Sequence, residues 1–99
     1  MIKRIVLLKL HESTISADWL ADFTAKTIAF FGEIPQVQSV HVSQTLEGES
    51  RRSWDLMLEV LFRTAKEVDD YIVHPRHRAY VDEVLQPIVA FKKAWNFRV

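Results

Sequence analysis

The chain has 99 residues, which suffices for a single domain, residues 1–99, near the lower size limit for an independent hydrophobic core. Thirteen basic and thirteen acidic residues cancel, so no global field steers the protein onto nucleic acid or an anionic membrane. The absence of cysteine excludes disulfides and thiolate catalysis. No apolar run has the length of a bilayer span or a signal peptide, so we expect a cytoplasmic protein. The basic pairs Arg51-Arg52 and Lys92-Lys93 are expected to be solvated surface.

Periodicity in the first two thirds of the chain predicts three strands and one long helix. Residues 2–10, 37–45 and 54–62 are rich in apolar and β-branched side chains, which indicates strands, and the polar segment 46–53 is expected to be a loop or hairpin connection. Ser16 is placed to cap the helix that follows the first strand. That helix carries one apolar stripe at helical spacing, formed by Leu20, Phe23, Thr27, Phe30, Phe31 and Ile34.

The last third predicts a helix pair and a closing strand. Thr64 and Glu67 have the spacing of a capping box and begin the first helix. A second helix over 75–86 starts with a proline, which suits a first helical turn, and stops before Pro87. Residues 91–99 alternate as a strand. The order strand, helix, strand, strand, helix pair, strand predicts an α+β, ferredoxin-like split βαβ protomer, with a four-stranded antiparallel sheet and helices on one face.

The predicted strands are apolar on both faces. In the first strand Val6 and Leu8 point one way, whereas Ile5 and Leu7 point the other way. The third strand repeats this pattern, with Leu56, Leu58 and Val60 opposite Met57 and Leu61. Helices on one face would leave the second apolar face in water, and such a patch marks an interface. We therefore predict a homodimer that packs sheet against sheet and buries roughly 1,600 Å² in total.

The second half of the chain also holds the clearest cluster of chemical groups. His77 is followed on one helical stripe by Tyr80, Val81, Val84 and Ile88, so it heads an apolar face and looks inward. An imidazole in that position needs a partner or a ligand.

Three segments resemble the stress-response dimeric α+β barrel (Dabb) domains. They are the opening strand 2–10, the end of the third strand at 59–62, and above all the element 70–77, with its Tyr-x-x-His-Pro-x-His pattern. The resemblance covers essentially the whole chain. It implies a ferredoxin-like protomer whose sheet packs on a partner's sheet as a dimeric α+β barrel. It also implies an apolar cavity between the helices and the sheet of each protomer.

The resemblance extends to a plant polyketide cyclase of the family, which closes a ring by aldol condensation without a cofactor. Its cavity tyrosine and histidine correspond to Tyr71 and His77 of this chain, and these two residues are the implied catalytic pair. The chain departs from the cyclase at Arg4 and Leu56, where the cyclase has histidines. Leu56 makes the implied cavity drier, and Arg4 gives it a fixed positive charge.

His77 and Tyr71 each have a catalytic and a structural interpretation. The reference pKa of histidine, about 6.5, suits general-base catalysis near neutrality, and the alternative for His77 is a hydrogen bond to a backbone carbonyl or to Tyr71. The hydroxyl of Tyr71 suits stabilisation of an oxyanion, and the alternative is a core aromatic with a satisfied hydroxyl.

Five further residues are candidates for ligand binding. Arg4 would favour a ligand that bears a carboxylate or an enolate, and its alternative is a strand-end arginine that reaches water or an acid. Phe23, Thr27 and Leu56 would line a cavity or fill it. His74 would contact a ligand or cap the helix start. We predict no metal site, because His74 and the histidine three residues later lack a third ligand.

These observations favour a stress-response-type homodimer that binds a small apolar or aromatic molecule, including an acidic one, between sheet and helices. A cofactor-free cyclase or isomerase that uses His77 and Tyr71 is one alternative, and a purely structural, stress-protective dimer is another. Whether the protein is an enzyme stays open. We expect no cofactor, because no glycine-rich phosphate loop is present. We expect no nucleic-acid partner, because the third strand lacks the glycine and stacking aromatics of an RNA-recognition domain.

Overall fold

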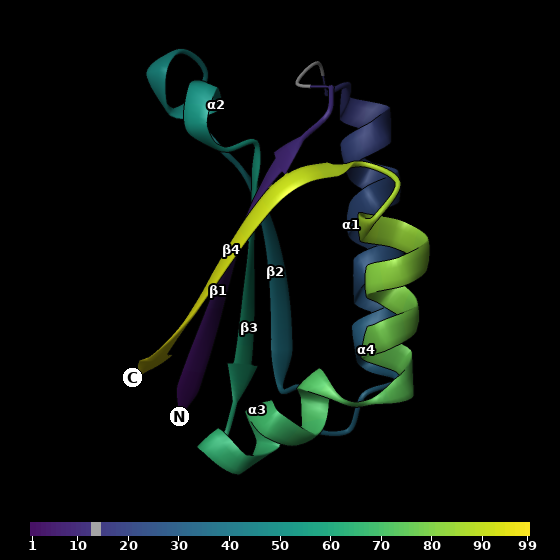
Figure 1. The fold of residues 1–99 in the computed structure, drawn as a ribbon, viewed down its shortest axis with the longest axis vertical. Helices are drawn as coiled ribbons and strands as arrows, with labels where there is room; N and C mark the ends of the chain where they lie inside the picture. Colours follow the sequence, from purple (N-terminus) through teal and green to yellow (C-terminus); the bar gives the residue numbers. More distant parts are fainter. Residues whose placement is uncertain (13–14) are drawn as a thin grey trace.

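The computed structural model describes residues 1–12 and 15–99 and shows an antiparallel four-stranded sheet with helices packed on one side (Figure 1). The strands, in the spatial order β2-β3-β1-β4, are β1 (Ile2–Leu10), β2 (Ser39–Gln44), β3 (Leu56–Phe62) and β4 (Val89–Arg98). The helices are α1 (Ala17–Gly32), α2 (Glu49–Ser53), α3 (Ala65–Ile72) and α4 (Pro75–Tyr80), and α4 continues into the π-helical turn η1 (Val81–Leu85). The predicted ferredoxin-like α+β fold is confirmed.

Two helices begin where the capping residues predict. The Ser16 hydroxyl accepts a hydrogen bond from the backbone N–H of Trp19 at 3.0 Å and starts α1. The Thr64 hydroxyl accepts from the backbone N–H of Glu67 at 3.2 Å and starts α3. Each bond satisfies an amide that has no partner within its own helix, so the caps fix the points at which the chain turns onto the sheet.

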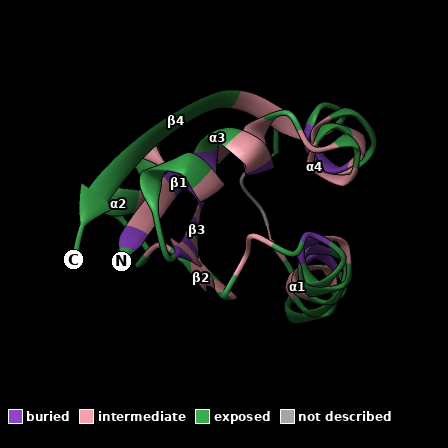
Figure 2. Cartoon of the chain, turned by 90° about the horizontal axis from the view of Figure 1, so that it is seen from below, coloured by how far each residue is buried: buried purple, intermediate pink, exposed green. Residues whose placement is uncertain are grey.

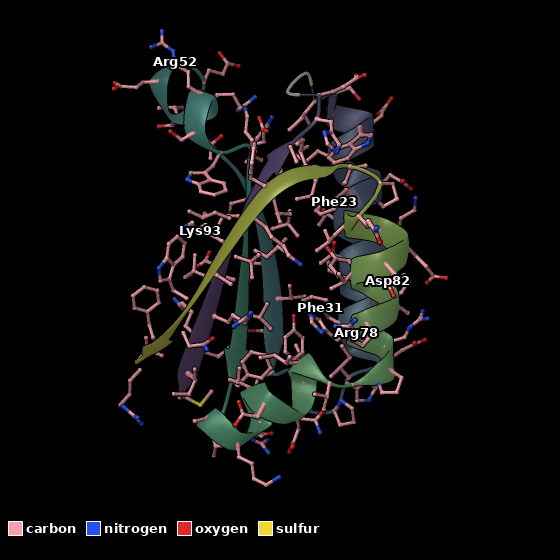
Figure 3. The ribbon with its side chains drawn as sticks, in the orientation of Figure 1. Phe23, Phe31, Arg52, Arg78, Asp82 and Lys93 are labelled. Carbon is pink, nitrogen blue, oxygen red and sulfur yellow. The ribbon has the colours of Figure 1, made fainter. Side chains whose placement is uncertain are left out.

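The core lies between the sheet and the helices. Alternate residues of β1 and β3 face α1 and α4, and these side chains are Ile2, Val6, Leu8, Leu10, Leu56, Leu58, Val60 and Phe62. In Figure 3, Phe23 and Phe31 lie between α1 and the sheet. Phe31 makes edge contacts with the rings of Tyr71 and Tyr80. The helices are therefore held to the sheet by an apolar layer with an aromatic centre.

The other side of the sheet is not covered by α1, α3 or α4. Figure 2 shows β4 exposed along most of its length. The register places Trp95 opposite Ile5, with Trp95 43% exposed. Figure 3 shows Lys93 on this same side, away from α1. We call this surface the open face and define its apolar part as Ile5, Leu7, Met57, Leu61, Phe91, Trp95 and Phe97.

The segment 46–53, predicted to be a loop or hairpin connection, instead contains the short helix α2. The helix follows Gly48, whose φ of +85° suits a residue without a Cβ. Arg51 stabilises the connection, because its guanidinium donates to the Thr45 carbonyl at 2.6 Å and to the Thr45 hydroxyl at 2.9 Å. Arg51 is therefore half-buried rather than plain surface, whereas Arg52 is exposed at the tip of α2 (Figure 3). A helix of five residues has no apolar stripe, so periodicity cannot reveal it.

The helix predicted over 75–86 changes its winding at Val81. Beyond that residue the chain forms η1, in which the backbone N–H of Gln86 donates to the Val81 carbonyl at 2.9 Å. Pro87 follows and cannot donate to a continued helix. One widened turn leaves the apolar stripe almost unchanged, which is why the sequence pattern predicts a single regular helix. Within the described residues, no helix is long and apolar enough to cross a bilayer.

Candidate functional site

A cavity of about 200 Å³ lies between the sheet and the helices α3 and α4, and we call it the central cavity. Its apolar wall includes Val6, Phe31 and Leu58. Its polar lining is Arg4 from β1, Tyr71 from α3, His77 and Tyr80 from α4, and Lys92 from β4. Three residues singled out from the sequence, Arg4, Tyr71 and His77, therefore lie around one space.

His77 is half-buried and held by the backbone. Its Nδ1 lies 3.0 Å from the carbonyl oxygen of Ile72, and because a carbonyl only accepts, Nδ1 carries the proton and Nε2 keeps the lone pair. Burial lowers the pKa of His77 below its ordinary value. The hydrogen bond to Ile72 raises the pKa and partly offsets this effect, whereas the positive charges of Arg4 and Lys92 lower it further. The imidazole is therefore neutral near pH 7, with Nε2 available as a base or an acceptor.

Tyr71 is almost fully buried beside His77. The two ring centroids are 4.2 Å apart, and the Tyr71 ring also contacts the rings of Phe31 and Phe62. Its hydroxyl makes no hydrogen bond to any residue that the structure describes, and it is not a fully enclosed atom, so it keeps some accessible surface beside the cavity. Burial raises the pKa of Tyr71, partly offset by the positive charge of Arg4, so the phenol remains a neutral donor. The alternative of a core tyrosine with a satisfied hydroxyl describes Tyr80 rather than Tyr71.

Arg4 points to the helix side of β1 and lines the central cavity. Its Nη1 donates to the Asn96 side-chain oxygen at 3.0 Å, a neutral partner on β4. Among the described residues Arg4 has no carboxylate partner; the ion pair of this strand end is made by Lys3 and Glu59, at 3.6 Å. The structural alternative for Arg4 was a side chain that reaches water or an acid, and the ion pairs of the described residues do not include one with an acid.

Lys92 and Tyr80 line the central cavity, although neither was predicted from the sequence to be a site residue. Tyr80 lies three residues after His77 on the same helical stripe, so the spacing alone could have indicated it. Lys92 was expected to be plain surface. It is exposed, but the antiparallel register pairs it with Leu8 and so places it on the helix side, where it also lines the cavity. Lys93, one residue later, faces the opposite way.

Two predicted ligand-binding residues on or near α1 lie outside the central cavity. Phe23 stacks on Trp19 with centroids 5.2 Å apart and lines a separate groove beside Ile88. Thr27 is fully buried, and its hydroxyl lies 2.9 Å from the Phe23 carbonyl and 2.7 Å from the Tyr80 hydroxyl. Thr27 therefore fixes the position of Tyr80.

Leu56 and His74 also lie outside the central cavity. Leu56 is fully buried in β3 as part of the core. His74 is the N-cap of α4, and its Nδ1 accepts a hydrogen bond from the backbone N–H of Arg76 at 3.0 Å. Among the described residues, no group of three or more His, Asp or Glu side chains is placed to hold a metal ion.

The buried tyrosines make the stability of the protein depend on pH in the alkaline range. The chain has two tyrosines, and burial raises the pKa of both above the ordinary value of about 10. The unfolded chain therefore loses these protons first, so the free energy of unfolding falls as the pH rises through about 10. We expect tyrosinate ultraviolet absorbance to appear together with the loss of helical circular dichroism. Tyrosinate formation near pH 10 with full helical signal would contradict the burial of both hydroxyls.

The fold and the cavity together define an α+β ferredoxin-like domain with a polar-lined space between sheet and helices. The family model of the stress responsive A/B barrel domain (Dabb) matches residues 2–96. The chain therefore belongs to this family, as its resemblance indicated.

Solved structures with the same fold include proteins from bacteria and a plant. A Dabb family protein from Mesorhizobium loti has a TM-score of 0.81 and 16% identity, covering 99% of this chain and 95% of that chain. A dimeric protein of unknown function from Bacteroides fragilis has a TM-score of 0.75 and 21% identity, with coverage of 99% and 95%. The hydroxynitrile lyase of Passiflora edulis has a TM-score of 0.78 and 13% identity, with coverage of 99% and 92%. At these identities the similarity shows the fold. A search of curated proteins found no match.

Proposed function

We propose that the protein is a homodimer in which each protomer binds a small apolar or aromatic molecule in the central cavity. Tyr71, His77 and Arg4 are the residues that contact this molecule. The open face supplies the contact between the two copies.

The observation that carries the binding function is the unpaired hydroxyl of Tyr71 beside the central cavity. A polar group on the wall of an apolar cavity, with no partner in the protein, is available to fix the orientation of a bound molecule. The Tyr71 hydroxyl has no partner among the described residues, and His77, whose ring centroid lies 4.2 Å from that of Tyr71, keeps a lone pair on Nε2. A bound molecule with one donor and one acceptor would satisfy both groups. An apolar cavity of about 150 Å³ holds benzene, so the space of about 200 Å³ suits a molecule with one ring.

The open face supports assembly with a second copy. Phe91, Trp95 and Phe97 are 71%, 43% and 50% exposed, and they line the same side of the sheet as Ile5. A cluster of exposed aromatic side chains of this kind is typical of an interface. The Bacteroides fragilis protein of the same fold is described as dimeric, which supports the proposal for this chain.

The binding function is tested with phenol as a probe and a variant that fills the cavity. Ala94 lines the central cavity, so Ala94→Leu places a larger side chain in the space. In wild-type protein we expect phenol to shift the NMR signals of Tyr71 and His77, and in Ala94→Leu we expect these shifts to disappear. Ala29→Leu, at an exposed position of α1, adds the same atoms elsewhere and is expected to behave as wild type.

Two outcomes would count against the binding function. Equal phenol shifts in Ala94→Leu and wild type would place the probe outside the cavity. A wild-type protein whose cavity signals do not respond to phenol would favour the alternative of a purely structural, stress-protective dimer.

A second candidate function is a cofactor-free cyclisation or isomerisation with His77 as the general base. The hydrogen bond from Nδ1 to Ile72 favours it, because it leaves Nε2 deprotonated on a histidine that lines the cavity. Tyr71 would then donate to a developing oxyanion. The Passiflora edulis protein of the same fold is an enzyme, which supports the possibility of chemistry in this fold. If molecules that bind in the central cavity are recovered chemically unchanged after incubation with the protein, the result supports ligand binding without catalysis.

A further inference from the structure

The central cavity is positively charged. Its lining contains two cations, Arg4 and Lys92, and no carboxylate. Neither cation takes part in an ion pair with any of the residues that the structure describes, 1–12 and 15–99. Both positive charges act on His77, whose pKa they lower, so their field reaches the interior of the cavity. Uncompensated cations beside an apolar, partly enclosed space favour an anionic ligand.

Arg4 is oriented by Asn96. The Asn96 side-chain oxygen accepts from Nη1 at 3.0 Å, which holds the guanidinium at the cavity without neutralising it. A guanidinium has five N–H donors in a planar fork, so most of them remain available after this single bond. Two parallel donors match the two oxygens of a carboxylate, and this geometry distinguishes arginine from a simple point charge.

Lys92 lies where the central cavity meets a second hollow. That hollow, of about 300 Å³, lies between η1 and the start of β4 and shares Val81, Leu85 and Lys92 with the central cavity. The side chain is exposed and stands on the same side of β4 as Asn96. A cation at this junction attracts an anion toward the space that Arg4 lines.

The rest of the cavity sets the size and character of the ligand. The rings of Phe31, Tyr71 and Tyr80 form its aromatic side, and the phenol of Tyr71, which has no partner among the described residues, belongs to the ring that lies beside His77. The Tyr80 hydroxyl is already engaged with Thr27 and adds no free donor. The volume of about 200 Å³ matches one ring with a small substituent.

We propose that the central cavity takes a small monocarboxylate with a single ring, whose carboxylate is bound by Arg4 and attracted by Lys92. This inference rests on the proposed binding function and gives it a chemical class. The ring packs against Phe31 and Tyr71. Asn96 is a positioning residue, since it acts through the guanidinium of Arg4.

The test compares benzoate with benzamide, a neutral molecule of nearly the same shape. Calorimetric titration of wild-type protein is expected to show tighter binding of benzoate, and an affinity that falls as salt is added. Hydrogen bonds to charged groups contribute enough that Arg4→Met should weaken benzoate about ten- to a hundredfold, with little effect on benzamide. Lys92→Met should weaken benzoate to a smaller extent. Lys93→Met, the neighbouring lysine on the open face, is the matched control and should leave both affinities unchanged.

The outcomes separate this inference from the function on which it rests. Benzamide binding as tightly as benzoate, or benzoate binding unchanged in both Arg4→Met and Lys92→Met, overturns the monocarboxylate but leaves the cavity as a binding site. Failure of both probes to bind wild-type protein overturns the binding function as well. If circular dichroism shows that Arg4→Met does not fold, the role of Arg4 is tested instead by Arg4→Lys and by the effect of salt on benzoate binding to wild-type protein. Arg4→Lys keeps the charge and loses the fork, so it is expected to bind benzoate more weakly than wild type; equal benzoate affinity in Arg4→Lys and wild type, with no effect of salt, overturns the monocarboxylate.

Discussion

Replacement of Trp95 by glutamate is expected to convert the dimer into a folded monomer. Trp95 lies near the middle of β4, opposite Ile5, and belongs to the apolar part of the open face. A two-fold dimer would bury this position twice, once from each copy. Each unpaired carboxylate buried in an interface costs about 3 kcal/mol or more, so the two copies together cost about 6 kcal/mol, which is roughly ten-thousandfold in the dissociation constant. Light scattering after size-exclusion chromatography measures the change in mass.

The matched control for this variant is Ile28→Glu. Ile28 is also an exposed apolar side chain, at 53% exposure, but it lies on α1, away from the open face. The control makes the same change of charge, so it should remain a dimer. Trp95→Glu that elutes with the same mass as wild type would show that this part of β4 is not in the interface.

Replacement of Phe31 by alanine is expected to cause the largest loss of stability. Phe31 is 1% exposed, and its ring lies 4.8 Å from that of Tyr80 and 5.8 Å from that of Tyr71. Truncation of a buried phenylalanine costs about 3–5 kcal/mol, against about 5–15 kcal/mol for the whole stability of a typical domain. Urea unfolding at one fixed protein concentration measures the difference, because the stability of a dimer would depend on concentration.

Ile28→Ala on the same helix is the control for Phe31→Ala. It removes an exposed apolar side chain and should change the free energy of unfolding by less than about 0.5 kcal/mol. A similarly small loss in Phe31→Ala would mean that the aromatic centre does not hold α1 to the sheet.

The sequence predicted the parts of the fold that depend on local patterns. Ser16 and Thr64 marked two helix starts, because a cap needs only its own neighbouring amides. The sequence of β1 predicted that Ile5 and Val6 lie on opposite faces of the sheet, because successive side chains of a strand point to alternate sides. The spacing after His77 predicted an inward-facing imidazole, and the structure places it at the cavity.

The site itself was only partly predictable, since it depends on how distant segments pair. Lys92 enters the cavity through the register between β4 and β1, which the composition of either strand does not reveal. A helical stripe shows that Phe23 and Thr27 face inward, but it does not show where along the helix a space remains. Both residues lie outside the cavity for this reason, and Leu56 is packed in the core in the same way.

The central cavity and the open face lie on opposite sides of the sheet. The helix side carries the cavity with Arg4, Tyr71 and His77, and the opposite side carries the aromatic patch around Trp95. Because successive residues of β4 point to alternate sides, Lys92 and Lys93 can be changed one at a time to perturb one surface and leave the other intact.

Sedimentation equilibrium of the wild-type protein at micromolar concentration tests most directly whether a second copy covers the open face. We expect a mass of twice the 11.6 kDa of one chain, with no dissociation over the concentrations at which Trp95→Glu is monomeric. A wild-type mass of 11.6 kDa under these conditions would contradict it, since the aromatic residues of β4 would then remain in water.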